Sequence, residues 1–189
     1  QNDFCPGGAL AVVDGDSIVS LINDKMNDYE VIALTQDWHP GGHSSFASSQ
    51  EGKSPLETFE MPYGTQVLWP DHCIQGTKGA AFHKSLQADA FQMIVRKGFR
   101  QAIDSYSAFF ENDHKTITGL DGYLRNRQID RLVLAGLATD YCVAFSALDA
   151  ASLGYKVAVV LPACRAIDLE GSLAAQITAM GNAGIELLE

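Results

Sequence analysis

The sequence predicts an α/β protein in three layers, with a doubly wound, mainly parallel sheet and helices on both of its faces. Short apolar runs at 31–36, 91–97, 132–135 and 156–161 have the length and composition of strands that are buried on both faces. Helical patterns alternate with these runs, and this alternation is typical of a parallel sheet. The 189 residues contain no repeat and no linker, so we expect a single domain over residues 1–189.

The N-terminal half is expected to hold a helix, a strand and a long irregular stretch. Asp16 or Ser17 can begin a helix that runs to about Tyr29. One stripe of this helix is apolar and consists of Ile18, Leu21, Ile22 and Met26. After strand 31–36, residues 37–80 are rich in Gly, Pro, Ser and His and show little periodicity. An irregular stretch of this length is usually functional in a compact domain.

The C-terminal half alternates strands with helices. Strand 91–97 is followed by a second irregular stretch that ends near residue 112. The remaining expected elements are a helix at 121–127, a strand at 132–135 that Gly136 stops, a helix at 139–153, a strand at 156–161, a helix at 168–183 and a strand at 185–188. In open α/β sheets, sites lie in the crevice at the carboxyl ends of the strands.

Composition limits the classes of partner. The net charge is −10 and the isoelectric point is near 4.8, which argues against nucleic acid or an anionic membrane surface, because phosphate binding needs basic patches. No apolar run reaches membrane-spanning length. The cysteines form no CxxC pair, so a reduced, cytoplasmic setting is the simplest expectation. They are Cys5, Cys73, Cys142 and Cys164.

Cys142 lies where a predicted strand turns into a predicted helix. Thr139 is the expected N-cap, which places Cys142 in the first helical turn. Free N–H groups and the helix dipole at this position favour a thiolate, and the same N–H groups can hold the oxyanion of an acyl-transfer reaction. The alternative is a small buried residue, as most free cysteines are. This stretch alone does not decide between the two interpretations.

Three side chains near strand ends suit a transition metal. Asp37 and His39 follow strand 31–36, and residues i and i+2 of an extended segment point to the same side. A carboxylate and an imidazole suit Zn, Mn or Fe(II), and His72 is a candidate third ligand. The alternative is a hydrogen-bonded pair without a metal. For His43 we weigh a further ligand, a substrate contact and a loop residue, and we favour the loop residue.

Lys97 ends strand 91–97 and would project into the same crevice. Its charge there would stabilise a thiolate and a developing oxyanion. The alternative is a strand-end lysine that reaches solvent. That arrangement is commoner, so Lys97 by itself is a weak indication of a site.

Six segments occur together in this chain: QNDFCPGGAL (1–10), TQDWHP (35–40), LWPDHC (68–73), RKG (96–98), DSYSAFF (104–110) and GLATDYCV (136–143). In this order they resemble the isochorismatase-like cysteine hydrolases, and within that family the nicotinamidases. Each segment alone is a weak signal. All six in register cover essentially the whole chain and make the resemblance highly specific.

The resemblance implies catalytic roles for the matching residues. Cys142 matches the position of the family's nucleophile, and Lys97 matches the position of its basic partner. The backbone N–H groups of Ala138 and Cys142 would form the oxyanion hole. The family has a cis peptide bond at this place, which here would join Leu137 to Ala138.

The resemblance also implies a metal site and a ring-binding pocket. One divalent metal, with zinc as the first choice and manganese or iron as alternatives, would be held by Asp37, His39 and His72. The walls around an aromatic ring would be Phe4, Leu10, Trp69 and Tyr106. Ordinary core packing is the alternative for these four, strongest for Leu10 and weakest for Trp69.

The third catalytic group of the family is an aspartate at the end of the first strand, two residues before the segment that begins here at Gln1. We expect a strand with this aspartate to precede Gln1 and to be central in the sheet. Asp3 matches the second aspartate of the family's segment, so we do not assign it as the base.

The resemblance implies hydrolysis of nicotinamide to nicotinate and ammonia through a cysteine thioester in a metal-assisted pocket, with pyrazinamide as a second substrate. The partner would be a small pyridine or pyrazine carboxamide, and a homo-oligomer remains an open alternative. One rival is another hydrolase of the superfamily, acting on isochorismate or a carbamoyl compound, and the predicted metal ligands argue against it. A second rival is a non-catalytic binding homologue that lacks the upstream aspartate. An NAD-binding protein is disfavoured because no GxGxxG follows a strand.

Overall fold

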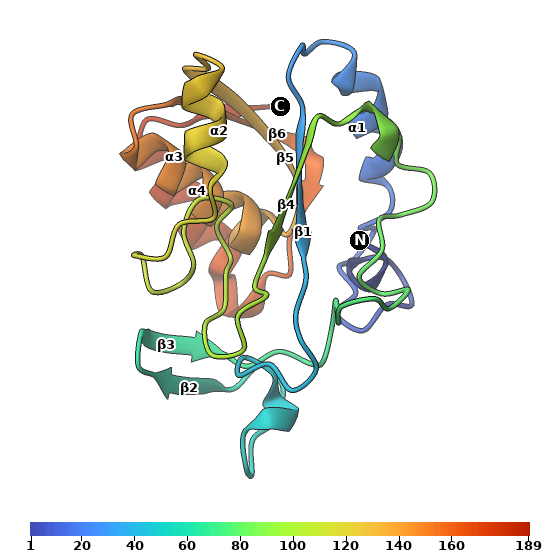
Figure 1. The fold of residues 1–189 in the computed structure, drawn as a ribbon, viewed down its shortest axis with the longest axis vertical. Coiled ribbons are helices and arrows are strands. Elements are labelled where there is room, and N and C mark those ends of the chain that lie inside the picture. Colours follow the sequence, from blue (N-terminus) through green and yellow to red (C-terminus); the bar gives the residue numbers. More distant parts are fainter.

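Parallel strands form the centre of the protein (Figure 1), for which a computed structural model describes residues 1–189. β1 (Ala33–Asp37) pairs with β4 (Met93–Lys97). β5 (Arg131–Leu137), β6 (Lys156–Arg165) and β7 (Glu186–Leu188) form a second sheet in that order. Every one of these strand pairs is parallel, which confirms the predicted α/β class with mainly parallel strands.

The predicted single sheet is divided between β1 and β5. Each of these two strands pairs along one edge only, β1 with β4 and β5 with β6. A cavity of about 650 Å³, lined mostly by apolar residues of both strands and of α1 (Ile18–Met26), lies between them. The same cavity reaches Asp37, Lys97 and Cys142. The free edges of β1 and β5 therefore lie next to the candidate catalytic residues.

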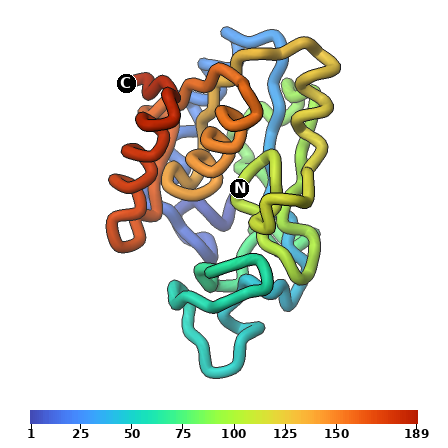
Figure 2. The backbone as a smooth tube through the Cα atoms, turned by 90° about the vertical axis from the view of Figure 1, so that its left-hand side faces the viewer, coloured from blue at the N-terminus to red at the C-terminus, as the bar shows by residue number.

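Helices lie on both sides of the β5–β6–β7 sheet. α1 contacts β5 and β6 from one side, whereas α3 (Ala144–Ser152) contacts β6 from the other side (Figure 1). α4 (Ser172–Asn182), red in Figure 2, packs beside α3, and α2 (Leu120–Asn126) completes this layer. On α3, Ala144, Ala147 and Ala150 are fully buried. Their small side chains let the helix approach the sheet closely.

An antiparallel hairpin lies within the stretch 37–80 that was predicted to be irregular. β2 (Thr58–Met61) and β3 (Gly64–Val67) pair with each other and with no other strand. Figure 1 shows this hairpin at the end of the molecule to which the carboxyl ends of β1 and β4 point. The prediction of a wholly irregular stretch is therefore wrong for these eight positions.

Two expectations around Cys142 are also corrected. β5 continues through Gly136, where φ is 133° and the β5–β6 register shifts, so Gly136 forms an irregularity inside the strand instead of ending it. Thr139 makes no capping bond, and residues Thr139–Val143 form a π-helical turn before α3. The Ala138 carbonyl accepts the N–H of Val143 at 3.1 Å, the i to i+5 bond of a π-helix. Cys142 therefore lies in this π-helical turn.

The remaining short elements are 3-10 helices. They span Asn2–Phe4, Ala47–Ser49, Ala88–Ala90 and Leu169–Gly171. None of the helices combines the length and the hydrophobicity that crossing a bilayer requires.

Candidate active site

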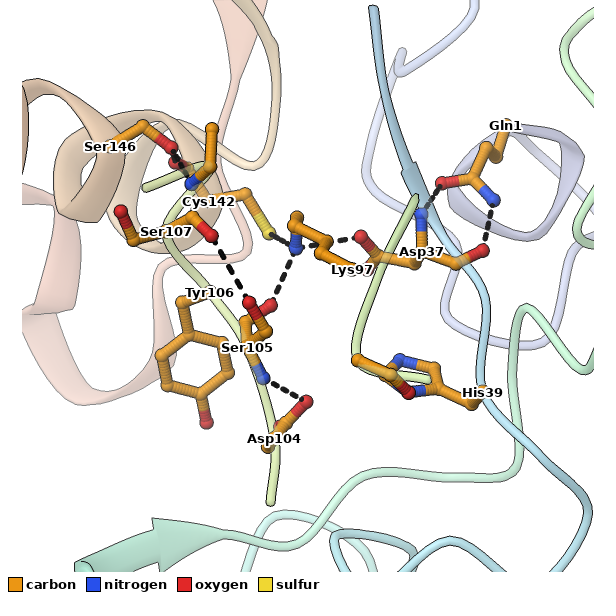
Figure 3. A network of polar contacts seen from close by, with 12 residues as sticks. Gln1, Asp37, His39, Lys97, Asp104, Ser105, Tyr106, Ser107, Cys142 and Ser146 are labelled. Atoms are coloured by element: carbon orange, nitrogen blue, oxygen red, sulfur yellow. Dashed lines mark hydrogen bonds and ion pairs between the residues drawn. The ribbon is translucent and has the colours of Figure 1, made fainter. Parts of the chain in front are cut away.

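Lys97 connects the candidate nucleophile to the candidate metal ligands. Asp37 and Lys97 are neighbours in the β1–β4 register, at the carboxyl ends of both strands. The Lys97 Nζ lies 2.7 Å from Oδ1 of Asp37 and donates hydrogen bonds to the Ser105 carbonyl at 2.6 Å and to the Cys142 sulfur at 3.4 Å (Figure 3). The structure therefore places Lys97 in the crevice, with its side chain only 2% exposed.

Burial and the ion pair determine the protonation states of these groups. Burial raises the pKa of Asp37, but the adjacent Lys97 ammonium outweighs this effect and holds it below its ordinary value. Burial lowers the pKa of Lys97, and the negative charges of Asp37 and Cys142 outweigh it, so the pKa is raised. Burial raises the pKa of Cys142 to about 11 although Lys97 opposes this shift. At neutral pH Cys142 is therefore a thiol that needs a proton acceptor before it can attack a carbonyl.

Asp37, His39 and His72 converge into a candidate metal-binding group. Their ligand atoms lie within 4.8 Å of one another, and all three side chains are buried. Nδ1 of His39 donates to the Gly98 carbonyl at 2.8 Å, and Nδ1 of His72 donates to the Pro70 carbonyl at 2.8 Å. These bonds fix the tautomers and leave the Nε2 lone pairs for a metal. One carboxylate and two imidazoles fit a divalent transition metal.

The environment keeps both imidazoles neutral. Burial is the main cause that lowers the pKa of His39 and of His72. The neighbouring imidazole of His43 lowers the pKa of His39 further, and that of His39 lowers the pKa of His72 further. A neutral imidazole is the form that binds a metal. Gly98 protects this arrangement, because a Cβ at Gly98 would overlap the ring of His39.

His43 is buried beside this group but has no free ring nitrogen. Its Nε2 lies 2.9 Å from the Arg100 carbonyl and 3.2 Å from the Ile103 carbonyl, so this nitrogen carries the hydrogen and donates it. Its Nδ1 accepts the hydroxyl hydrogen of Ser45 at 2.8 Å. His39, His43 and Asp104 also bring ligand atoms within 4.8 Å, but the lone pair of His43 is already used. These contacts support the interpretation of His43 as a loop residue.

A small pocket brings the predicted wall residues together with the nucleophile. Phe4, Leu10, Trp69 and Tyr106 all line this pocket, together with Asp37, His39, His72, Ala138 and Cys142. The indole of Trp69 meets the rings of Tyr141 and Tyr106 edge-on, at centroid distances of 4.9 and 6.2 Å. Aromatic walls of this kind favour an aromatic ring as the partner, through stacked and edge-on contacts. Leu10 therefore lies at the pocket and not only in the core.

Ala138 offers a free hydrogen-bond donor beside the sulfur. The peptide bond from Leu137 to Ala138 is cis, as the resemblance implies. The N–H of Ala138 donates to no protein acceptor, although Ala138 is only 2% exposed and lines the pocket. A buried donor without a partner is costly unless a ligand satisfies it. The pocket can therefore supply one N–H to an oxyanion.

Comparison with known proteins identifies one family and several similar proteins. The isochorismatase domain family matches residues 1–189. The chain belongs to the isochorismatase family. A nicotinamidase of Acinetobacter baylyi is 52% identical over 173 residues, which cover 92% of this chain and 81% of that protein. A solved nicotinamidase/pyrazinamidase of Acinetobacter baumanii is 52% identical with a TM-score of 0.99, covering 100% of this chain and 91% of the other. A zinc complex of the Pyrococcus horikoshii pyrazinamidase is 32% identical with a TM-score of 0.79, covering 100% and 94%.

The isochorismatase-family pocket also has wall residues that were not predicted. They are Asp104, Ser105, Tyr141 and Ile167. The first three lie inside the segments 104–110 and 136–143, so the resemblance covered their positions without assigning them roles. Ile167 follows the carboxyl end of β6, and the rule that sites lie at strand ends would have found it.

The side chain of Asp140 holds the loop that carries Ile167 through hydrogen bonds. The Asp140 carboxylate is 1% exposed and accepts the backbone N–H groups of Ile167 at 3.0 Å and Asp168 at 2.8 Å. It also accepts the hydroxyl of Ser172 at 2.5 Å. The loop after β6 and the turn that carries Cys142 are therefore held together by one buried side chain.

Replacing His72 with alanine is expected to weaken metal binding at this candidate site. The change removes one of three candidate ligands, so we expect the affinity for a divalent metal to fall at least about a hundredfold. Metal content after dialysis, measured by elemental analysis, checks this result. His114→Ala, at an exposed position outside the site, is the control and should keep the wild-type content. Full metal retention in His72→Ala would show that His72 is not a ligand.

Proposed function

We propose that the protein hydrolyses nicotinamide to nicotinate and ammonia, and that it also accepts pyrazinamide. The contact of Lys97 with both the Cys142 sulfur and the Asp37 carboxylate, at one end of an aromatic pocket, is the observation that carries this proposal. A thiol, an ammonium group and a free N–H in one pocket suit acyl transfer from an amide. The names and the identities of the relatives support the same substrate class.

In this proposal the substrate ring lies against the aromatic wall that contains Trp69 and Tyr106, with its carboxamide at Cys142. A base takes the thiol proton, and the sulfur forms a bond to the carbonyl carbon while the carbonyl π electrons move to oxygen. The N–H groups of Ala138 and Cys142 hold that oxyanion. The oxyanion collapses, the C–N bond breaks, and the base returns its proton to the leaving ammonia. Water then cleaves the thioester to nicotinate and restores the thiol.

The base in this proposal is an aspartate on a strand that precedes Gln1 and lies between β1 and β5. The free edges of both strands and the cavity between them support this position. The Gln1 side chain supports it as well, because its amide accepts the Asp37 N–H and donates to the Asp37 carbonyl, both at 2.8 Å. Figure 3 shows Gln1 beside Asp37, on the side away from Lys97. A carboxylate between the two free edges would lie close to Lys97 and Cys142, because the same cavity reaches both residues.

The metal in this proposal is zinc, held by Asp37, His39 and His72. The donor set of one carboxylate and two neutral imidazoles supports this choice, as does the zinc complex of the relative from Pyrococcus horikoshii. Such an ion, when bound, supplies a positive charge that polarises water and ligands in the pocket. Lys97 keeps Asp37 ionised for this role.

Ammonia release tests the proposed function. The full-length protein is incubated with nicotinamide before and after treatment with a strong chelator. We expect release that falls on chelation and returns when Zn, Mn or Fe is added. The absence of release from metal-loaded protein would reject nicotinamide as the substrate and favour a different amide or a binding role.

A further inference from the structure

Gln66 lies behind the pocket wall without lining the pocket. It belongs to β3 of the hairpin and is 1% exposed. Its amide nitrogen lies 2.7 Å from the hydroxyl oxygen of Tyr106, 2.9 Å from Oδ2 of Asp104 and 2.7 Å from the carbonyl of Val67, so its two hydrogens are shared among three acceptors. Its amide oxygen accepts from Nδ2 of Asn112 at 3.1 Å. One side chain therefore contacts two wall residues, Asp104 and Tyr106, from outside.

The orientation of this amide is fixed by its partners. The carboxylate of Asp104 and the carbonyl of Val67 can only accept hydrogen bonds, so the NH₂ group must face them. The Nδ2 of Asn112 can only donate, so the oxygen of Gln66 must face it. The opposite orientation would place oxygen against oxygen and nitrogen against nitrogen. The hydroxyl oxygen of Tyr106 consequently faces the NH₂ group of Gln66, and these partners fix the orientation of that group.

Tyr106 is held at both its ring end and its backbone. Its hydroxyl oxygen accepts a second bond from Nε1 of Trp69 at 3.1 Å, and its N–H donates to Oδ1 of Asn112 at 2.9 Å. Its ring meets Tyr141 and Phe145 edge-on at centroid distances of 5.4 and 5.1 Å. Figure 3 shows the Tyr106 hydroxyl pointing away from Cys142 and toward the hairpin. The hydroxyl therefore serves to fix the ring and does not face the reacting sulfur.

We propose that Gln66 is a positioning residue for the substrate ring, acting through the hydroxyl of Tyr106 to hold the aromatic wall in place. The inference rests on the proposed function, because a flat heteroaromatic substrate is what this wall would contact. It also gives a role to the hairpin β2–β3, which delivers Gln66 to the pocket. Lys97 and Cys142 are not among the partners of Gln66.

This role predicts an effect on binding instead of an effect on chemistry. A wall contact is the same in the bound substrate and in the transition state, and such uniform binding changes KM while leaving kcat unaltered. Loss of one buried hydrogen bond to the wall corresponds to about a tenfold change in an equilibrium constant. A purely structural role would lower the folded fraction, which reduces the apparent kcat and leaves KM unchanged.

The test is a double-mutant cycle on the full-length, metal-loaded protein. Gln66→Met is expected to raise KM for nicotinamide about tenfold and to keep kcat within about twofold. Tyr106→Phe is expected to raise KM similarly, and adding Gln66→Met to it should change KM by less than about twofold. Gln50→Met is the matched control, because Gln50 donates to the Ser44 carbonyl away from the pocket and its loss should leave KM unchanged. If Gln66→Met does not fold, Gln66→Asn replaces it, since its shorter amide cannot reach Tyr106.

Two results would overturn the inference. One is an unchanged KM in a folded Gln66 variant, and the other is a full tenfold effect that persists in the Tyr106→Phe background. The dissociation constant of nicotinate, measured by calorimetry, should rise in parallel with KM. This measurement separates the inference from the proposed function. A wild-type protein that binds nicotinate but releases no ammonia rejects the function, and the Gln66 cycle is then decided on nicotinate binding.

Discussion

Cys142→Ala is expected to lower kcat for nicotinamide at least about 10⁴-fold, because the proposed reaction passes through a bond to the Cys142 sulfur. Alanine fills the position without strain in the π-helical turn and leaves Lys97, Ala138 and the aromatic walls in place. Binding of nicotinate should therefore stay within about threefold of wild type, since the sulfur contributes to the transition state and not to the ring contacts. Steady-state kinetics and calorimetry measure the two quantities on the same preparation.

Cys164→Ala is the matched control for this experiment. Cys164 is 4% exposed on β6 and packs in the core formed by α3, α4 and the β5–β6–β7 sheet. Its loss should cost about 1 kcal/mol of stability and leave kcat unchanged. Acid quenching of the wild-type reaction, followed by mass spectrometry, should detect a nicotinoyl group on the peptide that contains Cys142. Turnover of Cys142→Ala near the wild-type rate would remove this residue from the nucleophile role.

The location of the site could be predicted because its residues lie at the carboxyl ends of strands. Asp37 ends β1, Lys97 ends β4 and Cys142 follows β5, and parallel strands bring their carboxyl ends to one edge. Buried parallel strands are visible in a sequence as continuous apolar runs. The contact of Lys97 with Asp37 also depends on the β1–β4 register, which pairs the two residues directly. No local pattern in either strand determines this register.

The hairpin β2–β3 was missed for a different reason. Its strands have four residues each, pair only with each other and present few buried side chains, so neither shows a strong apolar pattern. The available signal was the turn at Pro62-Tyr63-Gly64 between two short segments. The π-helical turn at Cys142 has no such signal, because it differs from the first turn of an α-helix by a single hydrogen-bond register. The polar network of Gln66 joins the hairpin to Asp104, Tyr106 and Asn112, about 40 residues further along the chain, and cannot be read from spacing.

Lys97→Met is expected to affect both activity and stability, because Lys97 is the buried cation of the site. It leaves the Asp37 carboxylate and the Ser105 carbonyl without their shared donor, and breaking a buried ion pair costs about 3–5 kcal/mol. Without the ammonium group the thiol proton is also harder to remove, because Lys97 is the group that opposes the upward shift of the Cys142 pKa. We expect kcat to fall at least about 10²-fold. Denaturant unfolding and steady-state kinetics measure the two effects.

The cost to stability should depend on Asp37 and on the metal. In the double variant Lys97→Met/Asp37→Asn the uncompensated charge is absent, so its unfolding free energy should exceed that of Lys97→Met alone. A bound divalent ion gives Asp37 another counter-charge, so Lys97→Met should lose less stability in metal-loaded protein than in chelated protein. Lys156→Met, at an exposed position that begins β6, is the control and should show neither effect. Equal losses with and without metal would contradict the assignment of Asp37 as a ligand, because the ion would then not compensate the charge that Lys97 neutralises.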